Sequence, residues 1–176
     1  MWHILVDGDF ELLLASAAHG KNVPGRKTDV KDAEWLADLL AHGLIRASFV
    51  PDQPTQQMRD LLRTRKQPVR ERISHTQRIQ KALEDANIKL DTDITNILGL
   101  TGRRILKRLI DGETLPAALA TLAHRNIQAT RDQMEAALRG RLTPHHRFLL
   151  KLHLDQIDAL DAAIASIDKE VEDMEP

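Results

Sequence analysis

The longest regular pattern of hydrophobic and polar positions lies between residues 55 and 90. Hydrophobic side chains recur there at a loose heptad spacing, at Met58, Leu62, Val69, Ile79, Leu83, Ala86 and Leu90. A heptad spacing places such positions along one side of an α-helix. The pattern therefore predicts one long helix, and Pro68 should kink it because proline removes a backbone donor.

A second long helix is predicted from about Thr143 onward. Its hydrophobic positions are spaced by threes and fours, at Leu150, Leu154, Ile157, Leu160, Ile164, Ile167, Val171 and Met174. Glycines and prolines interrupt residues 91–140, which predicts several short helices there. We interpret residues 55–176 as a helical, coiled-coil-like region. Since neither long helix can leave its hydrophobic side in water, we expect the two to pack antiparallel and to build a homo-oligomer.

The first 54 residues have a different pattern. The hydrophobic run "FELLLASAA" (10–18) is interpreted as a strand, and "IRASFVPDQP" (45–54) predicts another extended segment. Between them "HGKNVPGRK" (19–27) has the composition of a loop, after which a helix should run from about Asp29 to Gly43. The predicted fold class is mainly α with a small α/β part formed by residues 1–54.

The helix beginning at Asp29 carries two acids at its start. Asp29 and Asp32 are three residues apart and share one side of the helix with Leu36, Leu39 and Leu40. A buried carboxylate is costly unless it is hydrogen-bonded, paired or metal-bound. From the residues alone, an acid that interacts with the helix dipole is the leading explanation. The alternative is a pair of Mg²⁺ ligands, which would need further acids to complete a site.

Charge is distributed unevenly along the chain. The formal net charge is only −1, so any charged partner must be bound by local patches of charged residues. Residues 155–176 are strongly acidic, whereas a basic segment contains Arg59, Arg63, Arg65, Lys66, Arg70, Arg72, Arg78 and Lys81. These basic residues favour either ion pairs between the two long helices or binding of nucleic-acid phosphates. Lys21, Arg26 and Lys27 lie just before the two acids, and they favour either salt bridges with nearby acids or binding of a phosphodiester beside a metal-binding acid pair.

Other residue types limit which catalytic and metal-binding sites the chain can contain. The chain has no cysteine, which excludes disulfides, thiol nucleophiles and cysteine-based zinc sites. His145, His146 and His153 lack the spacing of a zinc site and are interpreted as solvated. No hydrophobic run is long enough for a membrane span and no signal peptide is indicated, so we expect a cytoplasmic protein without membrane contact.

Three stretches resemble the amino-terminal half of insertion sequence 110 family transposases: "NVPGRKTDVKDAEWLADLLAHGLIRASFVP", "RIQKALEDANIKL" and "HHRFLLKLHLDQIDALDAAI". That family is similar to Holliday-junction resolvases. Its RNase H-like domain carries an Asp, Glu, Asp, Asp tetrad that binds Mg²⁺, and a coiled-coil region and a serine-bearing domain follow. The resemblance implies that Asp29 and Asp32, in "KTDVKDA", are the last two tetrad acids, both catalytic and metal-binding. It also implies that residues 1–54 are a partial RNase H-like domain.

The resemblance further implies a DNA transposition or recombination protein, with DNA and a structured guide RNA as partners and Mg²⁺ as cofactor. The first two tetrad acids have no counterpart, because Asp7 and Asp9 fit a turn better. We therefore expect a fragment, truncated at both ends, that neither cleaves nor rejoins DNA alone. The alternatives are a non-catalytic module that binds nucleic acid or dimerises, and a purely structural helical bundle.

Overall fold

The computed structural model describes residues 5, 8, 11–16, 29–90, 96–123 and 129–174, with only the backbone described at 29–32. The predicted phosphate-binding residues Lys21, Arg26 and Lys27 lie outside the described residues. The chain divides into two compact units, Met1–Gln56 and Gln57–Pro176. Each unit is described by itself below.

The first unit contains helix α3, Asp29–Ala41, which begins at the predicted residue and ends two residues before the predicted Gly43. Its end is a Schellman motif, in which Gly43 N–H donates to Leu40 O at 3.0 Å and Leu44 N–H donates to Leu39 O at 2.9 Å. Gly43 has φ +67°, a left-handed conformation that glycine adopts without steric cost. The glycine therefore ends the helix and turns the chain away from it.

The predicted strand at residues 10–18 is not formed in the described residues, and that prediction is wrong. Residues 45–52 of the predicted extended segment lie outside any helix. Among the described residues, segments 11–16 and 45–54 meet at an isolated antiparallel bridge between Ala15 and Ala47, beside which Ser48 N–H donates to Leu14 O at 2.7 Å. A pair of extended segments is marginally stable without further strands or a helix packed on it. The mainly α fold class is confirmed, whereas an RNase H-like layer is not seen in this part of the chain.

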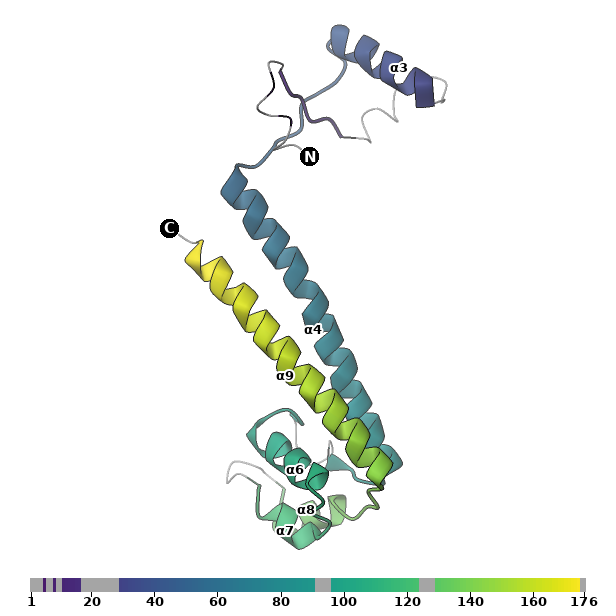
Figure 1. Cartoon of the computed structure of the whole chain (residues 1–176), viewed down its shortest axis with the longest axis vertical. Helices are drawn as coiled ribbons and strands as arrows, with labels where there is room; N and C mark the ends of the chain where they lie inside the picture. Colours follow the sequence, from purple (N-terminus) through teal and green to yellow (C-terminus); the bar gives the residue numbers. More distant parts are fainter. Residues whose placement is uncertain are drawn as a thin grey trace. The chain divides into compact units, whose positions relative to one another are not determined.

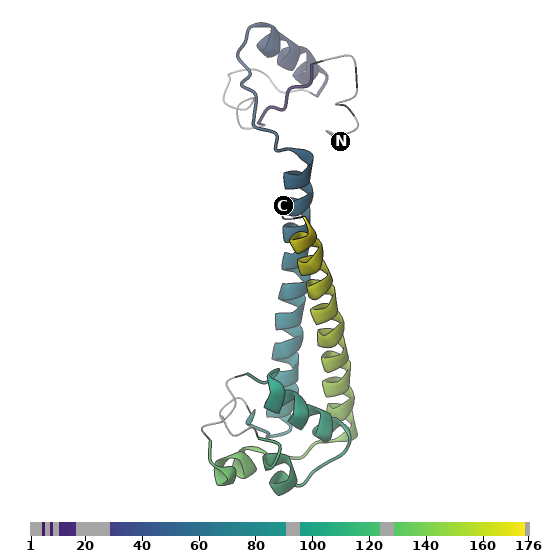
Figure 2. The same ribbon diagram turned by 90° about the vertical axis from the view of Figure 1, so that its left-hand side faces the viewer.

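The second unit is built on two long helices. Helix α4, Gln53–Asp85, continues through Pro68, and helix α9 is Pro144–Asp173. Figures 1 and 2 both show them side by side and antiparallel, as predicted. The short helices α6 (Leu100–Ile110), α7 (Pro116–Ala120) and α8 (Arg131–Ala137) gather at one end of this pair. Among the described residues, no helix is long and hydrophobic enough to cross a membrane.

Local sequence signals explain where the helices begin. Thr143 forms a capping box with His146, and Pro144 occupies the first turn of α9. Thr130 and Gln133 form the same arrangement at the start of α8. Each box satisfies backbone N–H groups that have no partner within the helix.

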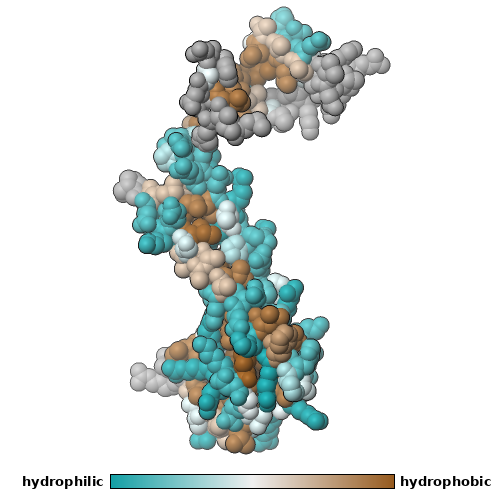
Figure 3. Space-filling model, viewed as in Figure 1, coloured by the Kyte–Doolittle hydropathy of each residue, from teal (hydrophilic) through white to brown (hydrophobic). Residues whose placement is uncertain are grey.

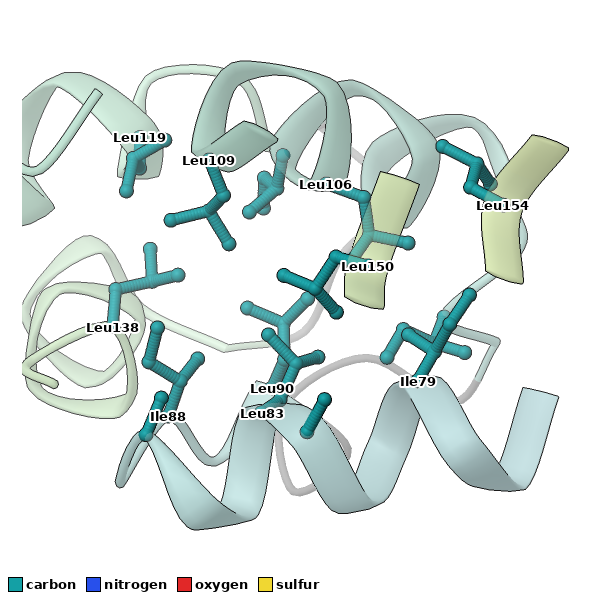
Figure 4. Packing of buried hydrophobic residues seen from close by; sticks show 14 of the residues in the cluster. Ile79, Leu83, Ile88, Leu90, Leu106, Leu109, Leu119, Leu138, Leu150 and Leu154 are labelled. Atoms are coloured by element: carbon teal, nitrogen blue, oxygen red, sulfur yellow. The ribbon is translucent and has the colours of Figure 1, made fainter. Parts of the chain in front are cut away.

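The hydrophobic core of this unit lies where the short helices meet the long ones. Figure 4 shows Leu83 of α4, Leu106 of α6 and Leu150 of α9 pointing into the same space, and each is at most 2% exposed. The buried residues of α4 begin only at Ile79, and those of α9 end at Ile157. Beyond these positions, polar contacts rather than a hydrophobic core join the two long helices.

Candidate nucleic-acid interface

Ion pairs join α4 and α9 outside the hydrophobic core. The Arg65 guanidinium binds both carboxylate oxygens of Asp168, with Nη2 3.0 Å from Oδ2, and Arg72 Nε binds Asp161 Oδ1. The hydrogen bond from Arg65 holds the pKa of Asp168 below its usual range. For Arg65 and Arg72, the ion-pair alternative is therefore confirmed, and these two arginines face α9.

A third arginine, missed by the sequence analysis, strengthens this contact. Arg103 of α6 binds Asp158 and Asp161 of α9, with Nη2 2.9 Å from Asp161 Oδ2. Arg72 and Arg103 therefore share Asp161. The acidic character of α9 is thus partly explained by inward-facing arginines of two other helices. The sequence contained one indication of this contact. Asp158 and Asp161 are three residues apart, which places both on one side of α9.

The remaining basic residues of α4 are exposed, and all except Arg78 face away from α9. They are Arg59, Arg63, Lys66, Arg70, Arg78 and Lys81, and we call them the basic stripe. At about 100° per residue, all except Arg78 fall within a sector of about 60°, on the side of the helix opposite Arg65 and Arg72. No ion pair joins any of them to a described residue.

The stripe has the length and composition of a phosphate-binding surface. From Arg59 to Lys81 it extends about 33 Å at 1.5 Å per residue. The acids of this segment, Asp60 and Glu71, lie to one side, and Glu71 accepts a hydrogen bond from Gln67 at 2.8 Å. Figure 3 shows that the visible surface of the long helices is mostly hydrophilic, with hydrophobic atoms in smaller patches. Unpaired cations on an exposed helix side can bind a polyanion without first breaking ion pairs.

The predicted acidic site lies at the start of α3, in the other unit. Asp29 and Asp32 are both in the first turn, so their backbones lie on one side of the helix; their side chains are outside the described residues. The described residues contain no group of three or more His, Asp or Glu side chains that could hold a metal ion. A complete Mg²⁺ site would need further oxygen ligands besides these two acids.

The hydrophobic stripe predicted to bury these acids is mostly exposed, which corrects the sequence analysis. Leu39 is 6% exposed, but Leu36 and Leu40 are 45% and 52% exposed. Only part of α3 thus finds a packing partner among the described residues of this unit.

Two histidines that were interpreted as solvated have structural contacts instead. His153 of α9 is half-buried, and its Nδ1 lies 3.1 Å from Nδ1 of His75 on α4. His146 takes part in the capping box with Thr143. The sequence contained a signal for the first contact, because His75 falls on the same side of α4 as Arg72 and Ile79.

Comparison with known proteins identifies the family. The model of the family of DEDD transposases of insertion sequence 110, described as "Transposase", matches residues 2–88. No curated protein and no solved structure matches the chain. The match includes α3 with Asp29 and Asp32 and the whole of α4 with its basic stripe. Over residues 2–88, the chain belongs to the insertion sequence 110 family of DEDD transposases.

Proposed function

We propose that this protein binds the sugar–phosphate backbone of DNA during transposition through the basic stripe of α4. The observation that carries the proposal is the separation of the cations of α4 into two sets. Arg65 and Arg72 are neutralised by α9, while the residues of the stripe are exposed and have no acidic partner in the described chain. Family membership supplies DNA as the substrate class.

The stripe supports recognition of backbone rather than of base sequence. Arginine and lysine contacts to phosphate fix position and orientation, whereas sequence is read at base edges or through DNA shape. A structured guide RNA presents the same phosphates, and we propose it as a second ligand of the same stripe. Competition between duplex DNA and RNA for one protein tests this extension.

We further propose that residues 1–54 act as part of an RNase H-like domain in which Asp29 and Asp32 bind Mg²⁺. Oxygen ligands suit this ion, and two carboxylates three residues apart on one helix fit two of its coordination positions. When bound, Mg²⁺ neutralises charge on the reacting phosphate. The two aspartates would hold the ion.

The binding proposal is tested by titrating labelled duplex DNA with the full chain at several salt concentrations. Each phosphate contact contributes about −0.9 to the slope of log K against log salt. Replacing Arg63 and Arg70 by glutamine should reduce the magnitude of this slope by about 1.8 and weaken binding at low salt.

The control carries the same charge change at exposed positions outside the stripe. Lys89 and Lys169 are both exposed, and replacing them by glutamine should leave the slope nearly unchanged. Equal slopes for the wild type and the Arg63→Gln, Arg70→Gln variant would remove the stripe as the binding surface. If the slope fell by the same amount in both variants, the net charge of the protein rather than the basic stripe would determine DNA binding.

A second candidate function is a dimerising helical module without chemistry. It is favoured by exposed hydrophobic side chains on α4, since Leu62 is 43% and Ile73 is 51% exposed. Both lie beside the basic stripe rather than within it. The two functions are compatible, and a dimer would present two stripes to one nucleic acid.

A further inference from the structure

The contact between His75 and His153 occupies a particular place in the helix pair. His75 lies on α4 between Arg72, which binds Asp161, and Ile79, which is fully buried. The two Nδ1 atoms are 3.1 Å apart, and the ring centroids are 5.2 Å apart with the planes tilted by 60°. Two nitrogen atoms from different helices are thus held close together at the edge of the hydrophobic core.

This separation matches the distance between two ligands of one metal ion. Zinc–imidazole bonds of about 2.0–2.1 Å place two nitrogens about 2.9 Å apart at a 90° angle and about 3.3 Å apart at a tetrahedral angle. The observed 3.1 Å lies between these values. In the structure the two nitrogens form a hydrogen bond, which needs a proton on one of them, and an ion bound between them would replace that proton.

We propose that His75 and His153 together bind one divalent transition-metal ion that prefers imidazole, such as Zn²⁺ or Ni²⁺, and that the ion links α4 to α9. Imidazole nitrogen is a good ligand for these ions. Both histidines are half-buried rather than enclosed, so water completes the coordination. Mg²⁺ is excluded from this site because it requires oxygen ligands in an octahedral arrangement.

The surroundings of the pair favour the protonation state that metal binding requires. A histidine must be neutral to bind a metal. Burial, and then the nearby charges of His75 and Arg78, hold the pKa of His153 below its usual value. The positive charge of Arg78 also repels a cation, which together with the small number of protein ligands makes the site weak and reversible.

The site is separate from the five residues of the basic stripe that face away from α9, and Arg78 is the one member of the stripe near it. Neither histidine belongs to the basic stripe, and both lie on the inward sides of their helices. Binding of the ion to the folded chain but not to the unfolded chain stabilises the folded state by mass action. The ion would therefore strengthen the helix pair at the point where its hydrophobic core ends.

The test measures urea unfolding of the full chain by far-UV circular dichroism, with Ni²⁺ or with EDTA. At an ion concentration ten times the dissociation constant, the folding equilibrium constant should rise about elevenfold. His75→Gln and His153→Gln should each lose this rise, whereas His145→Gln, at an exposed position of α9, should keep it. Mg²⁺ should not raise the folding equilibrium constant through His75 and His153.

A second measurement does not depend on the stability of a variant. Addition of Ni²⁺ to the wild-type chain should broaden the imidazole NMR signals of His75 and His153 at lower ion concentrations than those of His145 and His146. An equal Ni²⁺-dependent rise in stability in wild type and both glutamine variants would overturn the proposal. The proposal would also be overturned if Ni²⁺ broadened the signals of His145 and His146 first and left those of His75 and His153 unchanged.

Discussion

Arg63 and Arg65 are two residues apart on α4 and have different roles. A separation of two residues turns the side chain by about 200° around the helix. Arg65 binds Asp168 on α9, while Arg63 is exposed and has no acidic partner among the described residues. Helical phase, which can be calculated from the sequence, therefore separates residues that stabilise the fold from residues available to a ligand.

The ion pair of Arg65 and Asp168 leads to a prediction about pH. Because the pKa of Asp168 is lowered in the folded state, its contribution to stability is present above the unfolded pKa of about 3.9 and is lost as pH falls through the folded value. Asp168→Asn should therefore make the urea midpoint less dependent on pH between about 5 and 3. The effect should be small, because both partners are partly exposed and water screens the pair.

The matched control for this measurement is Asp173→Asn, which removes an exposed acid of the same helix that has no ion pair with a described residue. Its midpoint should follow that of the wild type between the same pH values. An unchanged profile in Asp168→Asn, or an equal change in both variants, would contradict the assigned ion pair.

At the scale of single elements, the helices of the second unit could be predicted from their hydrophobic spacing and their caps. Thr143 and Pro144 define the start of α9 within one residue of the prediction. The strand predicted around Ala15 is reduced to an isolated bridge with Ala47, because a strand depends on partners that its own residues do not reveal. For the same reason, the pairs of Arg103 with Asp161 and of His75 with His153 needed the tertiary structure.

A substitution in helix α6 can be tested by whether it raises or lowers the stability of the chain. Gly102 lies inside α6, where replacing an exposed glycine by alanine would stabilise the helix by about 0.5–1 kcal/mol. A Cβ at this position would lie 2.0 Å from the carbonyl oxygen of Ile97, which is backbone and cannot move aside easily. Gly102→Ala should therefore destabilise the chain by about 1–3 kcal/mol.

Thermal unfolding followed by circular dichroism measures this change. Arg104→Ala, at an exposed position of the same helix, is the control and should change stability little, since arginine and alanine have similar helix propensities. A stabilised Gly102→Ala variant would show that the close approach of α6 to Ile97 is not formed in solution.

At the scale of the whole second unit, hydrophobic burial is concentrated at one end and ion pairs act along the rest. The buried part of α4 begins at Ile79, yet the helix starts 26 residues earlier, at Gln53. Over that earlier part, Arg65 and Arg72 contact α9, while Leu62 and Ile73 remain exposed. Two helices joined in this way leave hydrophobic surface that a further helix pair could cover.

We therefore predict a homodimer in which this part of α4 packs against the long helices of a second copy. Ile157 and Ile164, which lie within the hydrophobic pattern of α9, are poor probes of such an interface, because Ile157 is fully buried in the core and its replacement would unfold the chain. Leu62 and Ile73 are exposed, so Leu62→Asp with Ile73→Asp should leave the monomer folded. Loss of two hydrophobic side chains from an interface should raise the dimer dissociation constant at least about tenfold.

Light scattering at micromolar protein, combined with size-exclusion chromatography, measures the dimer. The control is Phe148→Asp with Leu152→Asp, which makes the same kind of change at exposed positions of α9, next to the short helices. This variant should remain dimeric, because its side chains lie at the end of the helix pair where the core is already filled within one chain. A wild type that is monomeric at low salt would exclude the dimer. A control variant that dissociates while the α4 variant stays dimeric would instead place the interface at the opposite end of the helix pair.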